Sequence, residues 1–286
     1  MLQRWLVAII GLPLLLLVLV VCPPWATALL VCAIAGVAAY ELLHVAGKNA
    51  DRVVYALTVA AAAAQVAKIY FARAFLDFET CFPYLEENRA AGLFFLPLVL
   101  TAALFLRAVV TYDKPNAVPF STVAAGIVGG AVFPMMYASI VLLRMKYEYG
   151  QLYVLAPFFI AFAGDSLAMY CGKWFGKKKL TPVSPKKTWA GFYGNVLGSV
   201  LGMVIFALLG NRWLGYQPNW PGLIGVGVAA NLCGQLGDLS TSLIKREVGV
   251  KDYSRLFLTH GGVLDRFDST LFIAPVVYYF VNMGLI

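Results

Sequence analysis

Long apolar segments separated by short polar ones make up most of this 286-residue chain. A run of about 20 apolar residues is long enough to cross the hydrocarbon core of a bilayer as an α-helix. Nine such segments are found, at residues 5–21, 25–43, 53–72, 92–110, 118–143, 151–172, 191–210, 222–244 and 267–285. The pattern predicts an all-α, polytopic membrane protein of nine transmembrane helices.

Composition supports this prediction, because 61% of the residues are hydrophobic and only 13% are charged. A soluble domain does not have this composition. The net charge of +8 is typical of basic cytoplasmic loops that lie near anionic lipid headgroups. The sequence shows no soluble basic face with interleaved aromatic residues, so we expect the bilayer, and no nucleic acid, as a partner.

The charge distribution predicts an orientation in the membrane. With a cytoplasmic N-terminus, the basic segments at 48–52, 107–114, 173–187 and 245–266 fall inside, and the acidic loop at 77–87 falls outside. Arg144 and Lys146 are exceptions. Nine spans then leave the C-terminus outside.

The first apolar segment has a second interpretation. Arg4, the apolar run and Ala26-Thr27-Ala28 together resemble a signal peptide with its cleavage site. The consistent orientation favours a retained helix.

Residues 1–150 are rich in Ala, Leu and Val, and we expect them to form a transmembrane scaffold with a contribution to a lipid groove or an oligomer contact. The spacing of Gly126, Gly129 and Gly130 suits close helix packing and is compatible with a homodimer. Glu41 is expected at the membrane edge near His44.

Residues 151–286 hold the polar chemistry, with cytoplasmic basic loops predicted at 173–190 and 245–266. Charge is densest from Ser242 to Asp268, where five basic and four acidic side chains lie between apolar segments. On a helix, Asp238, Ser242 and Lys245 would share one face, as would Asp265 and Asp268 on the next.

Two helices would thus direct carboxylates toward a common point. Mg²⁺ prefers carboxylate oxygens together with substrate phosphates, and nearby lysines and arginines neutralise the remaining phosphate charge. The pattern predicts a nucleoside triphosphate held by a metal ion, with Asp238, Asp265 and Asp268 as metal ligands. A solvated basic loop is the alternative, but it does not explain Asp238 inside an apolar segment.

A second polar cluster begins with Asp165 and Ser166 inside the sixth apolar segment. It continues with six lysines among the fifteen residues from Lys173 to Lys187. Attraction to anionic lipid alone would account for the run at 177–179. Charge alone accounts less well for the segment Ser184-Pro185-Lys186-Lys187-Thr188-Trp189.

The two clusters together resemble the CDP-diacylglycerol synthases, also called phosphatidate cytidylyltransferases. The resemblance is carried by D-S-L-A-M-Y, G-K-W-F-G-K, S-P-K-K-T-W-A-G and the 27-residue run from Ser242 to Asp268, in this order. It covers about residues 160–275. The chain departs from the family pattern at Leu258-Thr259, where Pro-Gly is usual, and at Ala190, where Glu is usual.

The resemblance implies an Mg²⁺-dependent membrane enzyme of phospholipid biosynthesis that transfers the cytidylyl group of CTP to phosphatidate, giving CDP-diacylglycerol and pyrophosphate. Whether a second metal ion, divalent or monovalent, is bound stays open. The implied catalytic residues are Asp238, Lys245, Asp265 and Asp268. The implied substrate-binding residues are Asp165, Ser166, Ser184, Lys186, Lys187, Ser242, Arg246, Lys251, His260, Gly261, Gly262 and Arg266.

Within that set, Lys245, Arg246 and Lys251 would hold the triphosphate, and the His260-Gly261-Gly262 segment would shape the nucleotide pocket. Asp165 has the alternative role of orienting Lys or Ser partners from outside the metal shell.

Two other functions stay open at this stage. A CTP-dependent polyprenol or phytol kinase would need His260 or Asp252 as a base. An anion transporter would place polar groups in both halves of the chain, whereas here they are confined to the second half. The short chain favours a bacterial inner membrane, with the active site facing the cytoplasm.

Overall fold

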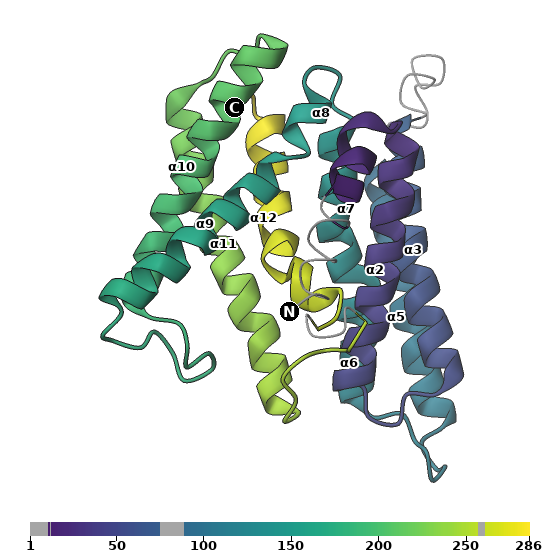
Figure 1. The fold of residues 1–286 in the computed structure, drawn as a ribbon. Coiled ribbons are helices and arrows are strands. Elements are labelled where there is room, and N and C mark those ends of the chain that lie inside the picture. Colours follow the sequence, from purple (N-terminus) through teal and green to yellow (C-terminus); the bar gives the residue numbers. More distant parts are fainter. Residues whose placement is uncertain (1–10, 12, 75–88, 257–260) are drawn as a thin grey trace. The chain divides into compact units, whose positions relative to one another are not determined.

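The computed structural model describes residues 11, 13–74, 89–256 and 261–286 (Figure 1). These residues form helices, and the β-type pairing within them is a single isolated bridge between Lys179 and Thr188. The prediction of an all-α protein is therefore confirmed.

The chain divides into two compact units. One comprises Met1–Met145 and Val248–Arg266. Its helices are η1 (Leu17–Val21), α2 (Pro24–Ala46), α3 (Arg52–Ala74), α5 (Arg89–Val110), α6 (Phe120–Ile127), η3 (Val128–Val132) and α7 (Phe133–Arg144), where η marks a π-helix.

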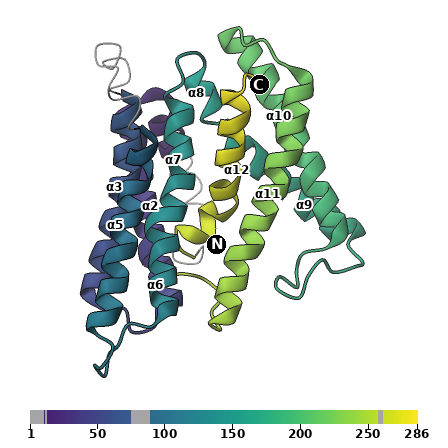
Figure 2. The same cartoon turned by 180° about the vertical axis from the view of Figure 1, so that it is seen from behind.

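The other unit comprises Lys146–Glu247 and Phe267–Ile286. Its helices are α8 (Gly150–Tyr153), α9 (Ala156–Phe175), α10 (Trp189–Leu214), α11 (Trp220–Glu247) and most of α12 (Leu264–Asn282). Both ribbon views show α9 and α10 side by side (Figures 1 and 2).

Six helical segments of the described chain are long and apolar enough to span a membrane. They are Pro24–Ala46, Arg52–Ala74, Phe120–Arg144, Gly150–Phe175, Trp189–Leu214 and Trp220–Glu247, and each coincides with a predicted span. The chain is therefore an integral membrane protein. Of the other three predicted spans, 5–21 falls partly outside the described residues, and 92–110 and 267–285 correspond to helices α5 and α12. The count of nine stays a prediction.

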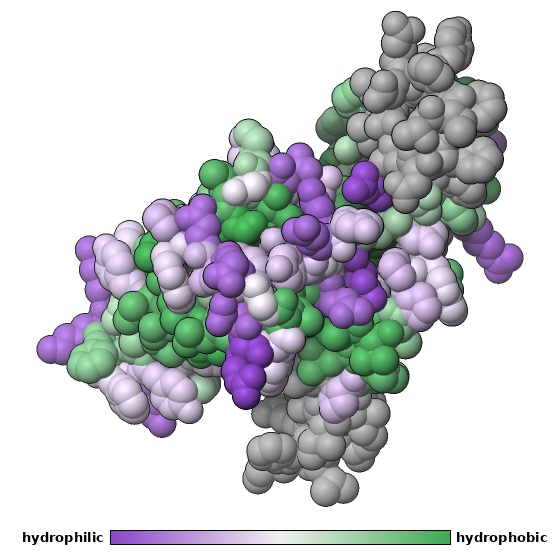
Figure 3. Space-filling view, turned by 90° about the horizontal axis from the view of Figure 1, so that it is seen from above, coloured by the Kyte–Doolittle hydropathy of each residue, from purple (hydrophilic) through white to green (hydrophobic). Residues whose placement is uncertain are grey.

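Helix α10 shows how the sequence assigns one face to protein and another to lipid. Its exposed side chains include Leu197, Leu201, Ile205 and Leu208, which recur at helical spacing on one face. Apolar side chains exposed on a spanning helix are suited to contact with acyl chains. Hydrophobic residues also reach the surface beside hydrophilic ones on the face shown in Figure 3.

A neighbouring face of α10 carries glycines that bring α9 into close contact. A Cβ atom added at Gly198 would lie 2.4 Å from the backbone oxygen of Ala163, and one at Gly202 would lie 2.6 Å from that of Phe159. Association of helices in a membrane depends on packing of this kind, because lipid is as apolar as the side chains.

The glycines predicted to pack closely in the first half do so. A Cβ atom at Gly129 would lie 3.3 Å from the Cα atom of Ala39 in α2, and one at Gly130 would lie 2.6 Å from the side chain of Leu100 in α5. Both glycines belong to η3, where the wider π-helical turn interrupts the α-helical course between α6 and α7.

We predict that Gly198→Ala destabilises the protein by about 1–3 kcal/mol, because the new methyl group overlaps the α9 backbone. The matched control is Gly225→Ala, where the added Cβ would meet the ring of Phe280 at an ordinary 3.4 Å. Thermal unfolding in detergent should show a lower midpoint for Gly198→Ala and an unchanged midpoint for Gly225→Ala. Equal midpoints would contradict the assigned helix contact.

Candidate active site

The basic loop between α9 and α10 folds back on itself. The backbone N–H of Leu180 donates to the carbonyl of Lys187 at 2.9 Å, and the N–H of Lys187 donates to the carbonyl of Ser184 at 3.0 Å. Pro185 stands inside that turn, where its fixed φ is favourable. The predicted Ser-Pro-Lys-Lys segment is therefore an ordered turn within the loop.

Thr188 connects this turn to helix α10. Its side-chain oxygen accepts a hydrogen bond from the N–H of Gly191 at 3.1 Å, which makes Thr188 the N-cap of α10. Lys187 thus stands one residue before a fixed helix start. The backbone that carries the Lys187 side chain is therefore held by the turn and by the start of the helix.

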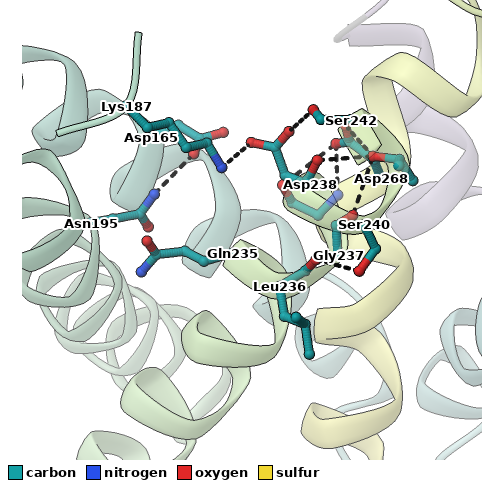
Figure 4. A network of polar contacts seen from close by, with 12 residues as sticks. Asp165, Lys187, Asn195, Gln235, Leu236, Gly237, Asp238, Ser240, Ser242 and Asp268 are labelled. Carbon is teal, nitrogen blue, oxygen red and sulfur yellow. Dashed lines mark hydrogen bonds and ion pairs between the residues drawn. The ribbon is translucent and has the colours of Figure 1, made fainter. Parts of the chain in front are cut away.

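The ammonium group of Lys187 forms an ion pair with Asp238. Lys187 Nζ lies 2.5 Å from Asp238 Oδ2, and both side chains are partly exposed (Figure 4). Ser242 Oγ donates to Asp238 Oδ1 at 3.4 Å, so the predicted i, i+4 face on α11 is present. Residues more than 50 positions apart in the sequence meet at this pair.

Asp268 on α12 faces the same part of α11. Thr241 Oγ1 donates to Asp268 Oδ2 at 3.4 Å, and the N–H of Ser269 donates to Asp268 Oδ1 at 2.7 Å. Asp268 and Lys245 are only 9% and 8% exposed. The charges of both Asp238 and Lys245 act on Asp268, so these three predicted site residues are brought together.

Asp265 binds the backbone of the signature loop, by which we mean residues 248–256 and 261–266. Its Oδ2 atom accepts from the N–H of Tyr253 at 2.8 Å and from the N–H of Gly262 at 3.0 Å. Gly261 has φ +80°, a conformation that favours glycine, and a Cβ there would lie 2.8 Å from the same oxygen. The structure thus gives Asp265 a role in ordering the loop, and its predicted role as a metal ligand stays a prediction.

The described residues contain no group of three or more carboxylate, histidine or cysteine side chains arranged to hold a metal ion. Any Mg²⁺ in this part of the chain would need substrate oxygens or water to complete its coordination, which is usual for Mg²⁺. His260 and the Leu258-Thr259 departure lie outside the described residues. The acidic loop at 77–87 does too.

The remaining predicted residues differ in their surroundings. Lys186, Arg246, Lys251 and Arg266 are exposed, and Ser184 is partly exposed. Ser166 Oγ donates to the carbonyl of Phe162 in its own helix at 2.7 Å, which supplies no contact to the rest of the site.

Sequence reasoning missed a ladder of polar side chains that connects α9, α10 and α11. Asn195 Nδ2 donates to Asp165 Oδ1 at 3.2 Å, and Asn231 Nδ2 in turn donates to Asn195 Oδ1. Gln235 Nε2 donates to Asn231 Oδ1 at 2.7 Å. Asn231 is 2% exposed. These residues stand singly inside apolar segments, and that was the signal in the sequence.

Two cavities adjoin this ladder, and both are lined by Asp165, Lys187, Asn195, Gln235 and Asp238. The first, of about 10 Å³, is enclosed mainly by polar groups. The second, of about 470 Å³, is larger and mixed in character. Its additional lining residues include Met169, Lys173, Lys186 and Phe192. The larger cavity can therefore accept a ligand with an anionic head and an apolar body.

The partners of Glu41 are a second feature that was not predicted from the sequence. Its side chain is 2% exposed, and its expected position at the membrane edge stays a prediction. Its Oε1 atom accepts from Ser254 Oγ at 2.6 Å and from the N–H of Val263 at 3.0 Å, and its Oε2 atom accepts from the N–H of Leu264 at 2.8 Å. No pattern in the sequence indicates that α2 reaches residues more than 200 positions away.

Comparison with known proteins shows the family of this chain. The model of a family described as "Cytidylyltransferase family" matches residues 2–283. The chain belongs to the cytidylyltransferase family. The resemblance to the CDP-diacylglycerol synthases found in the sequence is thereby confirmed.

Several curated members of the family named phosphatidate cytidylyltransferase are similar to this chain. The protein of Bacillus subtilis is 34% identical over 193 residues, which cover 67% of each chain. The Haemophilus influenzae protein is 40% identical over 48% of this chain and 51% of its own length. The Synechocystis protein is 41% identical over 48% of this chain and 45% of its own. The aligned regions of the last two thus span about half of those relatives.

We predict that Asn231→Ala lowers the free energy of unfolding by about 1–3 kcal/mol, because Gln235 Nε2 and Asn195 Oδ1 lose a buried partner. Asn282→Ala is the matched control, since Asn282 makes an exposed contact with Lys146. Unfolding in detergent should separate the two variants. Similar stability for both would argue against an energetic contribution from the ladder.

Proposed function

We propose that this member of the cytidylyltransferase family transfers the cytidylyl group of CTP to phosphatidate, giving CDP-diacylglycerol and pyrophosphate. The observation that carries the proposal is the cavity of about 470 Å³, in which Asp165, Asp238 and three lysines share the wall with apolar side chains. A phospholipid with a phosphate headgroup has this combination of charge and hydrocarbon. The relatives' shared name, phosphatidate cytidylyltransferase, supports the same reaction.

The reaction needs charge neutralisation more than it needs a base. The phosphate monoester of phosphatidate has its second pKa near ~6, so it is largely ionised at neutral pH. One of its oxygens attacks the α-phosphorus of CTP in line, and the bond from that phosphorus to the oxygen bridging to the β-phosphorus breaks. Pyrophosphate carries the electron pair away, and no proton has to be transferred to the protein.

Lysine side chains at the cavity would bring the two polyanions together. Lys173, Lys186 and Lys187 line it, and an ammonium group paired with phosphate oxygens offsets their mutual repulsion. Lys187 is held by the ordered turn and by Asp238, so its charge is preorganised rather than recruited from a mobile loop. Lys245, Arg246 and Lys251 are proposed to hold the triphosphate.

The carboxylates fit Mg²⁺ as a cofactor. Asp238 already forms an ion pair with a cation, the ammonium group of Lys187, at 2.5 Å. Asp268 is close enough for the charge of Asp238 to act on it. We propose that Asp238 and Asp268 hold Mg²⁺, with Asp265, which lies three positions earlier on α12. When bound, Mg²⁺ would offset charge on the phosphate oxygens.

We further propose a bacterial inner membrane location, a cytoplasmic N-terminus, nine spans, a homodimer and a site that opens to the cytoplasm. The distribution of basic segments supports the orientation, because positively charged loops are retained inside. The three relatives described above are bacterial. A site on the cytoplasmic side would be reachable by CTP from solution and by lipid from the bilayer.

We predict that label at the α-phosphorus of CTP enters the lipid phase, and that label at the γ-phosphorus does not. The assay would use purified protein in detergent with Mg²⁺, phosphatidate and polyprenol. Lipid label that depends on phosphatidate would establish cytidylyl transfer. Label from the γ position would identify a lipid kinase instead, and absence of lipid label from either position would direct attention to transport.

We predict that Asp238→Asn reduces turnover by at least about 100-fold, the upper end of what residues that only support metal ligands cost. The variant removes a charge that binds Lys187 and that we assign to Mg²⁺. Asp113→Asn, at an exposed position, is the control and should retain activity. Near-normal turnover by the Asp238 variant, with both proteins folded, would remove Asp238 from the metal site.

A further inference from the structure

Glu41 lies in a part of the chain to which the sequence assigned no chemistry. It is on α2, and its buried carboxylate accepts three hydrogen bonds from residues of the Val248–Arg266 segment within the same compact unit. A buried carboxylate is costly unless its oxygens are fully bonded. These three bonds therefore fix where the signature loop lies against α2.

The bonds come from two separate parts of the signature loop. Ser254 precedes residues 257–260, which lie outside the described residues, and Val263 and Leu264 follow them. Glu41 binds residues of both parts. Asp265 does the same one position earlier on each side, through the N–H groups of Tyr253 and Gly262.

The contact between Glu41 and the signature loop depends on the absence of a side chain at Gly262. A Cβ atom at Gly262 would lie 2.3 Å from Glu41 Oε1 and 2.5 Å from its Oε2. Any side chain here would displace the carboxylate. The space that a side chain would fill at Gly262 is thus occupied by the Glu41 carboxylate.

We propose that Glu41 is a positioning residue for CTP: it holds the signature loop in the conformation that receives the nucleotide. The inference rests on the proposed function and on the role in shaping the nucleotide pocket that the family resemblance implies for Gly261 and Gly262. Glu41 does not touch the reacting atoms in this proposal. Glu41 acts through the backbone N–H groups of Val263 and Leu264, which directly follow Gly262.

Glu41→Gln provides the test, because the side chain keeps its shape but loses one acceptor. In either orientation of the amide, its NH₂ group faces at least one backbone N–H that the carboxylate had bonded. We predict that the apparent KM for CTP rises about tenfold or more, the loss expected for a hydrogen bond to a charged group. The KM for phosphatidate should stay unchanged.

Two further variants keep the test decisive. Ser254→Ala removes one of the three bonds to Glu41 and leaves the N–H groups of Val263 and Leu264 bonded to it, while the exposed N–H of Leu256 loses its bond to Ser254 Oγ. It should shift the CTP KM in the same direction by less. Glu148→Gln makes the same chemical change at an exposed position and should have no effect. Lower kcat and lower thermal stability with both KM values unchanged would make Glu41 purely structural and overturn the proposal.

Amide hydrogen exchange separates this inference from the proposed function. Glu41→Gln should accelerate amide exchange at Val263 and Leu264. Added CTP should slow this exchange in both proteins, and the wild type should need a lower CTP concentration than the variant. If the wild type makes no CDP-lipid, the proposed reaction fails, whereas the CTP-dependent exchange still tests Glu41. Equal CTP dependence in both proteins would overturn the positioning role.

Discussion

Carboxylates placed among apolar helices must be matched by donors or cations, and this constraint organises the chemistry of the protein. A charge that is buried without a partner costs free energy on the order of several kcal/mol. Asp238 meets the requirement through Lys187 and Ser242, and Asp268 through Thr241 and the N–H of Ser269. Every partner comes from a fixed helix or from an ordered turn. The site is therefore preorganised before any substrate binds.

The glycine-rich packing of α9 against α10 is what allows polar groups to reach one another inside the helices. A Cβ at Gly164 would lie 2.3 Å from Asn195 Oδ1 and 2.6 Å from Ser199 Oγ. Glycine at that position thus makes room for the ladder that ends at Asp165. The same residue type that permits close helix contact also brings polar side chains from three helices together, so packing and chemistry are coupled.

The signature segment from Ser242 to Asp268 contributes to both compact units, and its acids do different things in each. Asp268 faces Asp238 and Lys245, whereas Asp265, with Glu41, binds the backbone of the loop. Two carboxylates only three positions apart on α12 therefore have different surroundings. One lies among charges suited to phosphate chemistry, and the other lies among backbone amides that fix the loop conformation.

The sequence by itself determined the all-α membrane architecture, because apolar segments of spanning length have few alternatives in a bilayer. It also identified the family and most of the charged residues near the cavity, since lysines and acids inside apolar segments are costly unless they have a role. Only the tertiary structure decided which of them meet. The Lys187–Asp238 pair, the Asn195–Asn231–Gln235 ladder and the bonds of Glu41 to Val263 and Leu264 join residues distant in sequence, and helical periodicity orders side chains only within one helix.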